Sequence, residues 1–245
     1  MAGLIAALAG TADAQGRGGG RGGAPEPPRI GKAGAFFDPT GYWVSVVTED
    51  WRLRMVTPKK GDYVGVSLNP EGRKIADGWD PAKDEAAGEQ CRSYGAPNIM
   101  HVPGRLNVTW QDDQTLKIET DSGKQTRLFY FTAPPANAGG GWQGLSKATW
   151  DVIPGGRGMA PVGSLKVVTT NMKPGYLRKN GVPYSANAVL TEYFDRVNEP
   201  NGDAFLVVTT TVEDPAYLTQ PLLTASHYRK QADASGWNPT ACSAR

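Results

Sequence analysis

Residues 105–131 read RLNVTWQDDQTLKIETDSGKQTRLFYF, and this stretch alternates apolar and polar side chains in three runs, residues 105–110, 115–120 and 125–131. Short polar segments separate the runs. Period-two alternation is typical of strands that bury one face, and short turns rich in Asp and Gly join antiparallel neighbours. We therefore predict an antiparallel meander. One face carries Leu106, Val108, Trp110, Leu116 and Ile118, and the other carries Arg105, Asn107, Lys117 and Glu119.

The same alternation continues on both sides of the meander. It predicts further strands at residues 41–47, 51–56, 63–68, 148–152, 164–170, 188–197, 204–212 and 222–230. The 245 residues include 31 glycines and 19 prolines, which break helices and argue against an all-α fold. We predict an all-β fold of about ten strands: a single antiparallel β-barrel or a strongly bent sandwich.

Two segments have the pattern of a helix start. Asn69-Pro70-Glu71 places an N-cap residue before a proline and an acidic residue, and Asp80-Pro81 repeats this order before residues 82–89. We expect one or two short helices to cover an end of the barrel.

The N-terminal 34 residues differ in composition from the rest. Residues 1–14 hold a short apolar run and then Ala12-Asp13-Ala14, the small-residue pattern of a signal peptidase site. No Lys or Arg precedes Arg17, which favours a truncated leader, and the alternative is a frayed apolar N-terminus. Residues 15–34, rich in Gly, Arg and Pro, predict a disordered linker. We expect a β-barrel domain over residues 35–245 in a soluble, periplasmic or secreted protein.

The balance of charges and the length of the apolar runs limit the binding partners that the chain could have. The 26 Lys and Arg nearly balance the 24 Asp and Glu, so no strong field favours a nucleic acid. No stretch reaches the 18 or more apolar residues that a membrane-spanning helix needs. We expect no nucleic acid partner and no membrane span, and the oligomeric state stays open.

The chain has two cysteines, Cys91 and Cys242. An even number in an exported chain favours a disulfide, and two unpaired thiols are the alternative. His101 and His227 show no close ligand spacing, so we expect no zinc or other metal site.

Gly41-Tyr42-Trp43 resembles the Gly-x-Trp entry of lipocalin-type barrels, in which the Trp plugs the closed end. A broader resemblance rests on EQC (89–91), GAP (95–97), PGR (103–105), GLSKATW (144–150), LKVVT (165–169), NGVPYS (180–185), LTEYF (190–194), RV (196–197), EDP (213–215) and LTQP (218–221). This order resembles a group of exported proteins common in Acidobacteria and Proteobacteria. The resemblance implies a fold and a location outside the cytoplasm, but it does not imply a mechanism. That group more often has histidine at Tyr184, so no histidine role carries over there.

Four residues are candidates for proton transfer. Glu49 shares a face with Trp43 and Trp51 if the alternation runs through it, and burial there would raise its pKa; the alternative is a turn at Glu49-Asp50 in water. Glu192 shares one strand face with Phe194 and Arg196. Glu192 and Arg196 form either a polar pair that faces the lumen or an exposed pair. His101 and His227 could each transfer protons near neutral pH, or lie at the barrel surface.

Aromatic residues and arginines are the candidates for ligand contact. Seven Trp are more than a core of this size requires, and such residues often line cavities. Arginines bind carboxylates or phosphates, and the alternative is ordinary surface pairing. The candidates are Trp43, Trp51, Arg52, Arg54, Arg105, Trp110, Tyr130, Trp150 and Tyr193.

Three functions fit these observations. The first is an exported barrel that binds a small, largely apolar molecule in its lumen, oriented by an Arg and a few hydroxyls, without a cofactor. The second is a cofactor-independent lyase, isomerase, cyclase or hydrolase that uses a buried Glu and His in the same cavity. The third is a structural module of the cell envelope. No Gly-x-Ser-x-Gly motif supports acyl transfer of the α/β-hydrolase kind.

Overall fold

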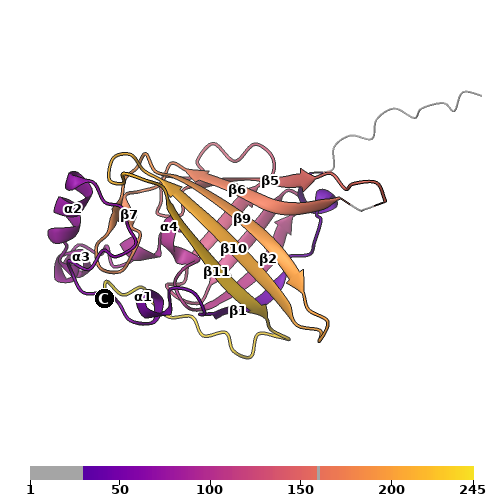
Figure 1. Ribbon diagram of the computed structural model, residues 1–245, viewed down its shortest axis with the longest axis horizontal. Coiled ribbons are helices and arrows are strands. Elements are labelled where there is room, and N and C mark those ends of the chain that lie inside the picture. The colour runs from indigo at the N-terminus through magenta and orange to yellow at the C-terminus, as the bar shows by residue number, and fades with distance from the viewer. Residues whose placement is uncertain (1–29, 159–160) are drawn as a thin grey trace, which may run out of the picture.

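The computed structural model describes residues 30–158 and 161–245. Nine strands close into a barrel, which confirms the predicted all-β barrel (Figure 1). The barrel strands are β1 (Gly41–Val46), β2 (Arg105–Asp112), β3 (Thr115–Thr120), β4 (Thr126–Tyr130), β5 (Leu145–Ile153), β6 (Val162–Thr170), β9 (Val189–Asn198), β10 (Ala204–Glu213) and β11 (Leu222–Lys230). The signal peptide expected at residues 1–14 lies outside the described residues.

One pair of neighbouring strands in the barrel is parallel. The order around the barrel is β1-β11-β10-β9-β6-β5-β4-β3-β2. Directions cannot alternate all the way round a ring with an odd number of strands, so at least one pair must be parallel. That pair is β4–β5, and only Phe129↔Ser146 and Tyr130↔Lys147 form it. The other pairs are antiparallel, as predicted.

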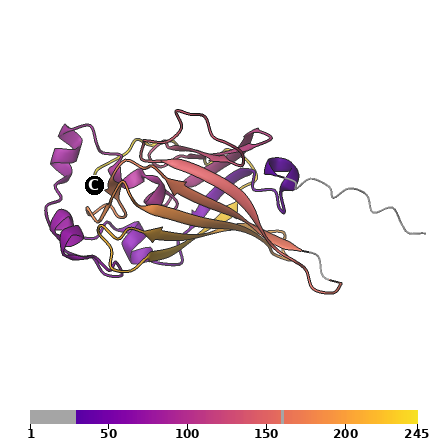
Figure 2. The same ribbon diagram turned by 90° about the horizontal axis from the view of Figure 1, so that it is seen from above.

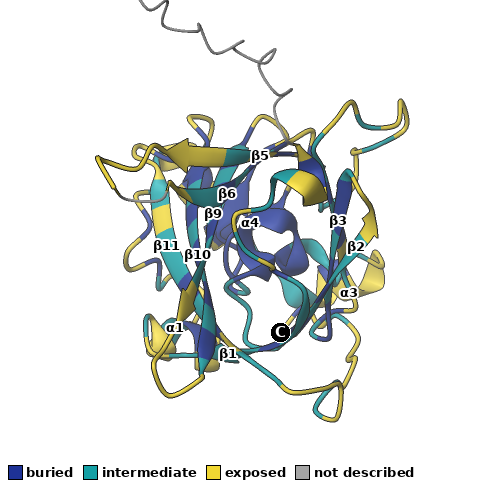
Figure 3. Cartoon of the chain, turned by 90° about the vertical axis from the view of Figure 1, so that its right-hand side faces the viewer, coloured by how far each residue is buried: buried dark blue, intermediate teal, exposed yellow. Residues whose placement is uncertain are grey.

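The barrel interior is filled by side chains along most of its length. The predicted meander is present, with Val108 opposite Ile118 and Trp110 opposite Leu116. The largest apolar side chains of this core are fully buried, and Figure 3, which looks along the barrel, shows buried residues lining the ring of strands. They include Trp43, Leu106, Phe129, Phe194, Leu206 and Tyr228. The apolar core therefore occupies the middle of the barrel.

Short helices cover one end, which we call the helical end (Figures 1 and 2). These elements are α1 (Trp51–Met55), α2 (Pro70–Asp77), α3 (Pro81–Ala86), η2 (Arg92–Tyr94), α4 (Ala96–Ile99) and the small sheet of β7 (Gly175–Tyr176) and β8 (Pro183–Tyr184). The two predicted helix starts are confirmed, because Asn69 and Asp80 each accept a hydrogen bond from the first turn of the helix that follows. A second apolar cluster, including Tyr63, Ala76, Tyr184 and Leu190, packs these elements onto the barrel.

Two predicted strands are wrong. In the segment predicted as a strand at residues 51–56, Trp51–Met55 form α1, because Asp50 adopts the left-handed conformation (φ 49°) and ends the extended run. Trp51 and Met55, one helical turn apart, then face solvent, while Arg54 is buried. At some positions such a helical spacing coincides with a period of two, which explains the strand prediction. Residues 63–68 form only one bridge, Leu68 to Leu218, since positive φ at Gly61 and Gly65 interrupts the chain there.

The N-terminal segment closes the opposite end of the barrel. Residues Gly31–Gly34 form a 3-10 helix, η1, beside β5. The indole of Trp150 donates a hydrogen bond of 2.8 Å to the Gly31 carbonyl oxygen. Gly31–Gly34, expected within the linker, thus form a regular element in contact with the barrel, while residues 15–29 of that linker lie outside the described residues.

The expected disulfide is present between Cys91 and Cys242, whose Cα atoms are 5.1 Å apart. It ties the C-terminal segment to the helical end. In that segment the Thr240 amide donates to the Asp121 carbonyl oxygen at 2.8 Å. Within the part of the chain that the structure covers, no helix combines the length and apolar character needed to cross a membrane.

Candidate functional site

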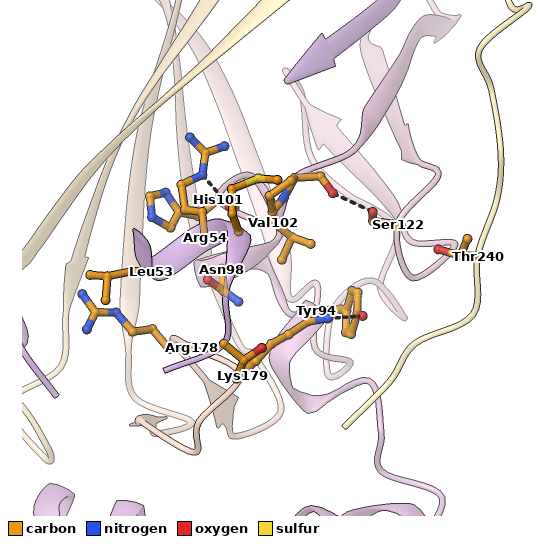
Figure 4. A pocket seen from close by; sticks show the side chains of 13 residues that line it. Leu53, Arg54, Tyr94, Asn98, His101, Val102, Ser122, Arg178, Lys179 and Thr240 are labelled. Carbon is orange, nitrogen blue, oxygen red and sulfur yellow. Dashed lines mark hydrogen bonds between the residues drawn. The ribbon is translucent and has the colours of Figure 1, made fainter. Parts of the chain in front are cut away.

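A pocket of about 280 Å³ opens at the helical end, and we call it the helical-end pocket (Figure 4). Its walls come from α1, the segment around α4, the β3–β4 turn, the β7–β8 hairpin and the C-terminal segment. The lining residues are apolar (Leu53, Met55, Val102, Pro103), hydroxyl-bearing (Thr57, Tyr94, Ser122, Thr240), amide or imidazole (Asn98, His101) and cationic (Arg54, Arg178, Lys179).

Four of the predicted site residues meet beside this pocket. The Arg54 side chain is fully buried, and its Nε donates to the His101 carbonyl oxygen at 2.8 Å. Its Nη1 forms an ion pair with one carboxylate oxygen of Glu49, and the other oxygen lies 2.8 Å from Nδ1 of His227 on β11. Arg54 and His101 line the pocket, whereas Glu49 and His227 do not, and Glu49 holds Arg54 through their ion pair.

The pKa of Glu49 moves opposite to the sequence-based expectation. Glu49 lies in the turn after β1 and not on an inward-facing strand position. Partial burial by itself would raise its pKa, but hydrogen bonds from Thr48 and His227 and the charge of Arg54 outweigh it and lower the pKa. Glu49 is therefore an ionised partner of Arg54 at neutral pH and is not prepared as a general acid.

His101 is a pocket residue whose pKa is strongly lowered. Its side chain is only 13% exposed, and its Nδ1 lies 3.3 Å from the Ser226 hydroxyl. Burial, followed by the positive charge of Arg54, lowers its pKa to about 4, against the opposing charge of Asp50. His101 is consequently neutral at pH 7, and a base with this pKa accepts protons weakly there.

We expect this shift to make stability depend on pH. Because the folded-state pKa of about 4 lies below the ordinary 6.5, stability is complete above pH 6.5 and is lost as the pH falls toward 4. The loss attributable to His101 is about 3 kcal/mol over this range. Urea unfolding of the wild type and of His101→Gln between pH 7 and pH 4.5 measures it. The variant should show the flatter profile, and parallel profiles would contradict the assignment.

Glu192 lies inside the barrel, away from the pocket. Its two oxygens accept hydrogen bonds of 2.8 and 2.6 Å from Nη1 and Nη2 of Arg127, and both side chains are fully buried. Arg127 also donates to Thr169 at 3.3 Å. The suggested partner Arg196 instead binds the Asp38 carbonyl oxygen near the surface. Sequence reasoning missed Arg127, although its position in phase with inward-facing Phe129 is a usable signal.

Two predicted ligand contacts, Trp110 and Trp150, lie at the opposite, aromatic end of the barrel. Phe131 stands between them, with ring centroids 5.6 Å from Trp110 and 5.8 Å from Trp150. A second pocket of about 490 Å³ opens there, and it has no charged residue in its lining. Its lining is Ile30, Gly34, Phe36, Phe131, Ala148, Thr149, Trp150 and Val152.

The remaining candidates do not gather at either pocket. Trp43 is fully buried in the core, where its indole donates to the Pro39 carbonyl oxygen. Trp51 and Arg52 are on the exposed face of α1. Arg105, Tyr130 and Tyr193 are half-buried, and Arg105 lies 3.8 Å from Asp121 while Tyr193 contacts Lys166.

Several pocket residues carried no sequence signal. Four separate segments supply Tyr94, Ser122, the neighbouring Arg178 and Lys179, and Thr240, and no local pattern links these segments. Among residues 30–158 and 161–245, no cluster of three His, Cys, Asp or Glu side chains is arranged to hold a metal ion. Comparison of the chain with protein-family models, curated proteins and solved structures finds no match.

Proposed function

We propose that the protein is an exported β-barrel that binds a small molecule in the helical-end pocket. The observation that supports this most directly is the composition of that pocket, which combines an apolar wall with hydroxyl, imidazole and cationic groups in about 280 Å³. Binding sites typically pair apolar lining with a few convergent polar groups. The binding site is therefore proposed at the barrel end and not in the lumen, because core side chains occupy the middle of the barrel.

The polar groups around the pocket favour binding over catalysis. Glu49 is engaged by Arg54 and His227, and Glu192 is engaged by Arg127 inside the barrel. His101 is neutral and weakly basic at pH 7, which suits a hydrogen-bonding contact. The aromatic-end pocket, by contrast, offers no charged group that would orient a ligand.

Export to the periplasm or beyond is part of this proposal. The disulfide between Cys91 and Cys242 supports it, since such bonds persist in oxidising compartments.

A bulky residue at the mouth of the helical-end pocket should prevent binding. Thr57 is exposed and lines the pocket, so Thr57→Trp would place an indole across it. We expect the wild type, purified from its own host, to retain a small molecule in native mass spectrometry and Thr57→Trp to lose most of it.

Val56→Trp is the matched control for this experiment. Val56 is also exposed and adjacent in sequence but does not line the pocket, so this variant should retain the molecule. Retention by Thr57→Trp at the wild-type level, or a wild type that carries no molecule and gains none from a host extract, would reject the proposal.

A second candidate is a cofactor-independent enzyme at the same pocket. The observation that favours it is the approach of Glu49, Arg54, His101 and His227 within one hydrogen-bonded group. Its test is the fate of the retained molecule: turnover by the wild type that His101→Gln abolishes would establish catalysis, whereas unchanged ligand after prolonged incubation would leave the carrier function.

A further inference from the structure

The lining of the helical-end pocket is positively charged. Three cationic residues line it, and no Asp or Glu does. Glu49 neutralises Arg54, whose guanidinium is turned toward the Glu49 carboxylate and the His101 carbonyl group. Arg178 and Lys179, at the tip of the β7–β8 hairpin, therefore carry the charge that is left over.

Arg178 is a buried cation with little compensation. Its Nη1 donates to the Val64 carbonyl oxygen at 2.5 Å, and this is the side-chain hydrogen bond it makes to the described residues. No carboxylate oxygen of those residues lies within 4.0 Å of it, and Asp50 and Asp62 act on it only from farther away. A guanidinium has five N–H donors, so Arg178 keeps donors that the described residues do not use.

Lys179 and Tyr94 form a second group of donors. Lys179 Nζ donates to the Tyr94 hydroxyl oxygen at 2.7 Å and lies 4.6 Å from the ring centroid (Figure 4). The Ser243 amide donates to the same oxygen at 3.3 Å. Because both contacts use Tyr94 as the acceptor, the hydroxyl hydrogen of Tyr94 is left to donate, and two hydrogens of the Lys179 ammonium are left as well.

We propose that the ligand of this pocket carries an oxyanion, a carboxylate or a phosphate, that binds to Lys179 and the Tyr94 hydroxyl, while Arg178, whose side chain points away from this pair (Figure 4), adds positive charge elsewhere in the pocket lining. This inference rests on the proposed function. Hydrogen bonds from an ammonium and a hydroxyl group match the acceptor oxygens of such a group. Leu53, Val102 and Pro103 then cover the apolar remainder of the molecule. Asp50, whose carboxylate lies 3.7 Å from the His101 ring, is a nearby negative charge that weakens the binding of an anion.

Isothermal titration calorimetry on the full chain tests this inference with three probes of similar size. Benzoate and phenyl phosphate carry the two kinds of oxyanion, and benzyl alcohol is the neutral match. We expect at least one anion to bind tenfold or more tighter than benzyl alcohol, and the stronger arm identifies carboxylate or phosphate. Lys179→Gln should weaken that anion at least tenfold, added salt should weaken it further, and Lys179→Arg should restore part of the affinity.

Arg52→Gln is the matched control, because it also removes one positive charge from the helical end, but on the exposed face of α1. It should leave the affinity for the anion within about twofold of the wild type. Anions that bind no tighter than benzyl alcohol, or equal losses in Lys179→Gln and Arg52→Gln, would overturn the inference. Failure to bind any of the three probes would also overturn it. Native mass spectrometry of the wild type and of Thr57→Trp tests the proposed function independently of these probes.

Discussion

Replacing Cys91 and Cys242 together by serine is expected to lower the free energy of unfolding by about 4–5 kcal/mol. The disulfide joins residues that are 151 positions apart, so its loss frees a very large loop in the unfolded chain. Domains are stable by only about 5–15 kcal/mol in total. The double variant should therefore unfold at a much lower urea concentration than the oxidised wild type, as followed by tryptophan fluorescence.

The reduced wild type is the natural control for this variant, and it should unfold together with the double-serine variant. Ser243→Ala keeps the disulfide and serves as a second control in the same C-terminal segment, where the Ser243 side chain is at the surface. Its midpoint should stay close to that of the wild type. A double-serine variant as stable as the oxidised wild type would show that the bridge contributes no stability.

Replacing Glu192 by glutamine is expected to cost about 3–5 kcal/mol, because it leaves the Arg127 guanidinium buried without its anion. Both side chains are fully buried, and their two hydrogen bonds of 2.8 and 2.6 Å connect β9 to β4 across the inside of the barrel. Water cannot replace the missing carboxylate there. Urea unfolding of the variant at neutral pH measures the cost.

Two further variants isolate the cause of this effect. Arg127→Met combined with Glu192→Leu removes both charges and should recover most of the lost stability, since an apolar pair of similar volume often replaces a buried ion pair without cost. Arg229→Met breaks an exposed ion pair with Asp203 at 2.7 Å and should cost no more than about 1 kcal/mol. A double variant that is less stable than Glu192→Gln would contradict this account.

The strand positions were largely predictable from local pattern. Residues 115–120 and 222–230 are strands with the predicted bounds, and the inward faces of the meander agree with the alternation of its side chains. The same reasoning failed at residues 51–56, where a left-handed Asp50 begins a helix in a segment that also alternates. A short segment can satisfy both periods, so contacts with the rest of the chain decide between them.

The sequence by itself determined an all-β fold, as a barrel or a strongly bent sandwich, and favoured a disulfide over two unpaired thiols, because side-chain alternation and cysteine number are local or compositional properties that can be read without the tertiary structure. Only the tertiary structure decided that Arg127 pairs with Glu192, that His101 loses its basicity, and that Lys179 meets Tyr94. These relations depend on distances between residues far apart in the chain. Barrel closure and the packing of the helical end fix those distances, and no single segment encodes them.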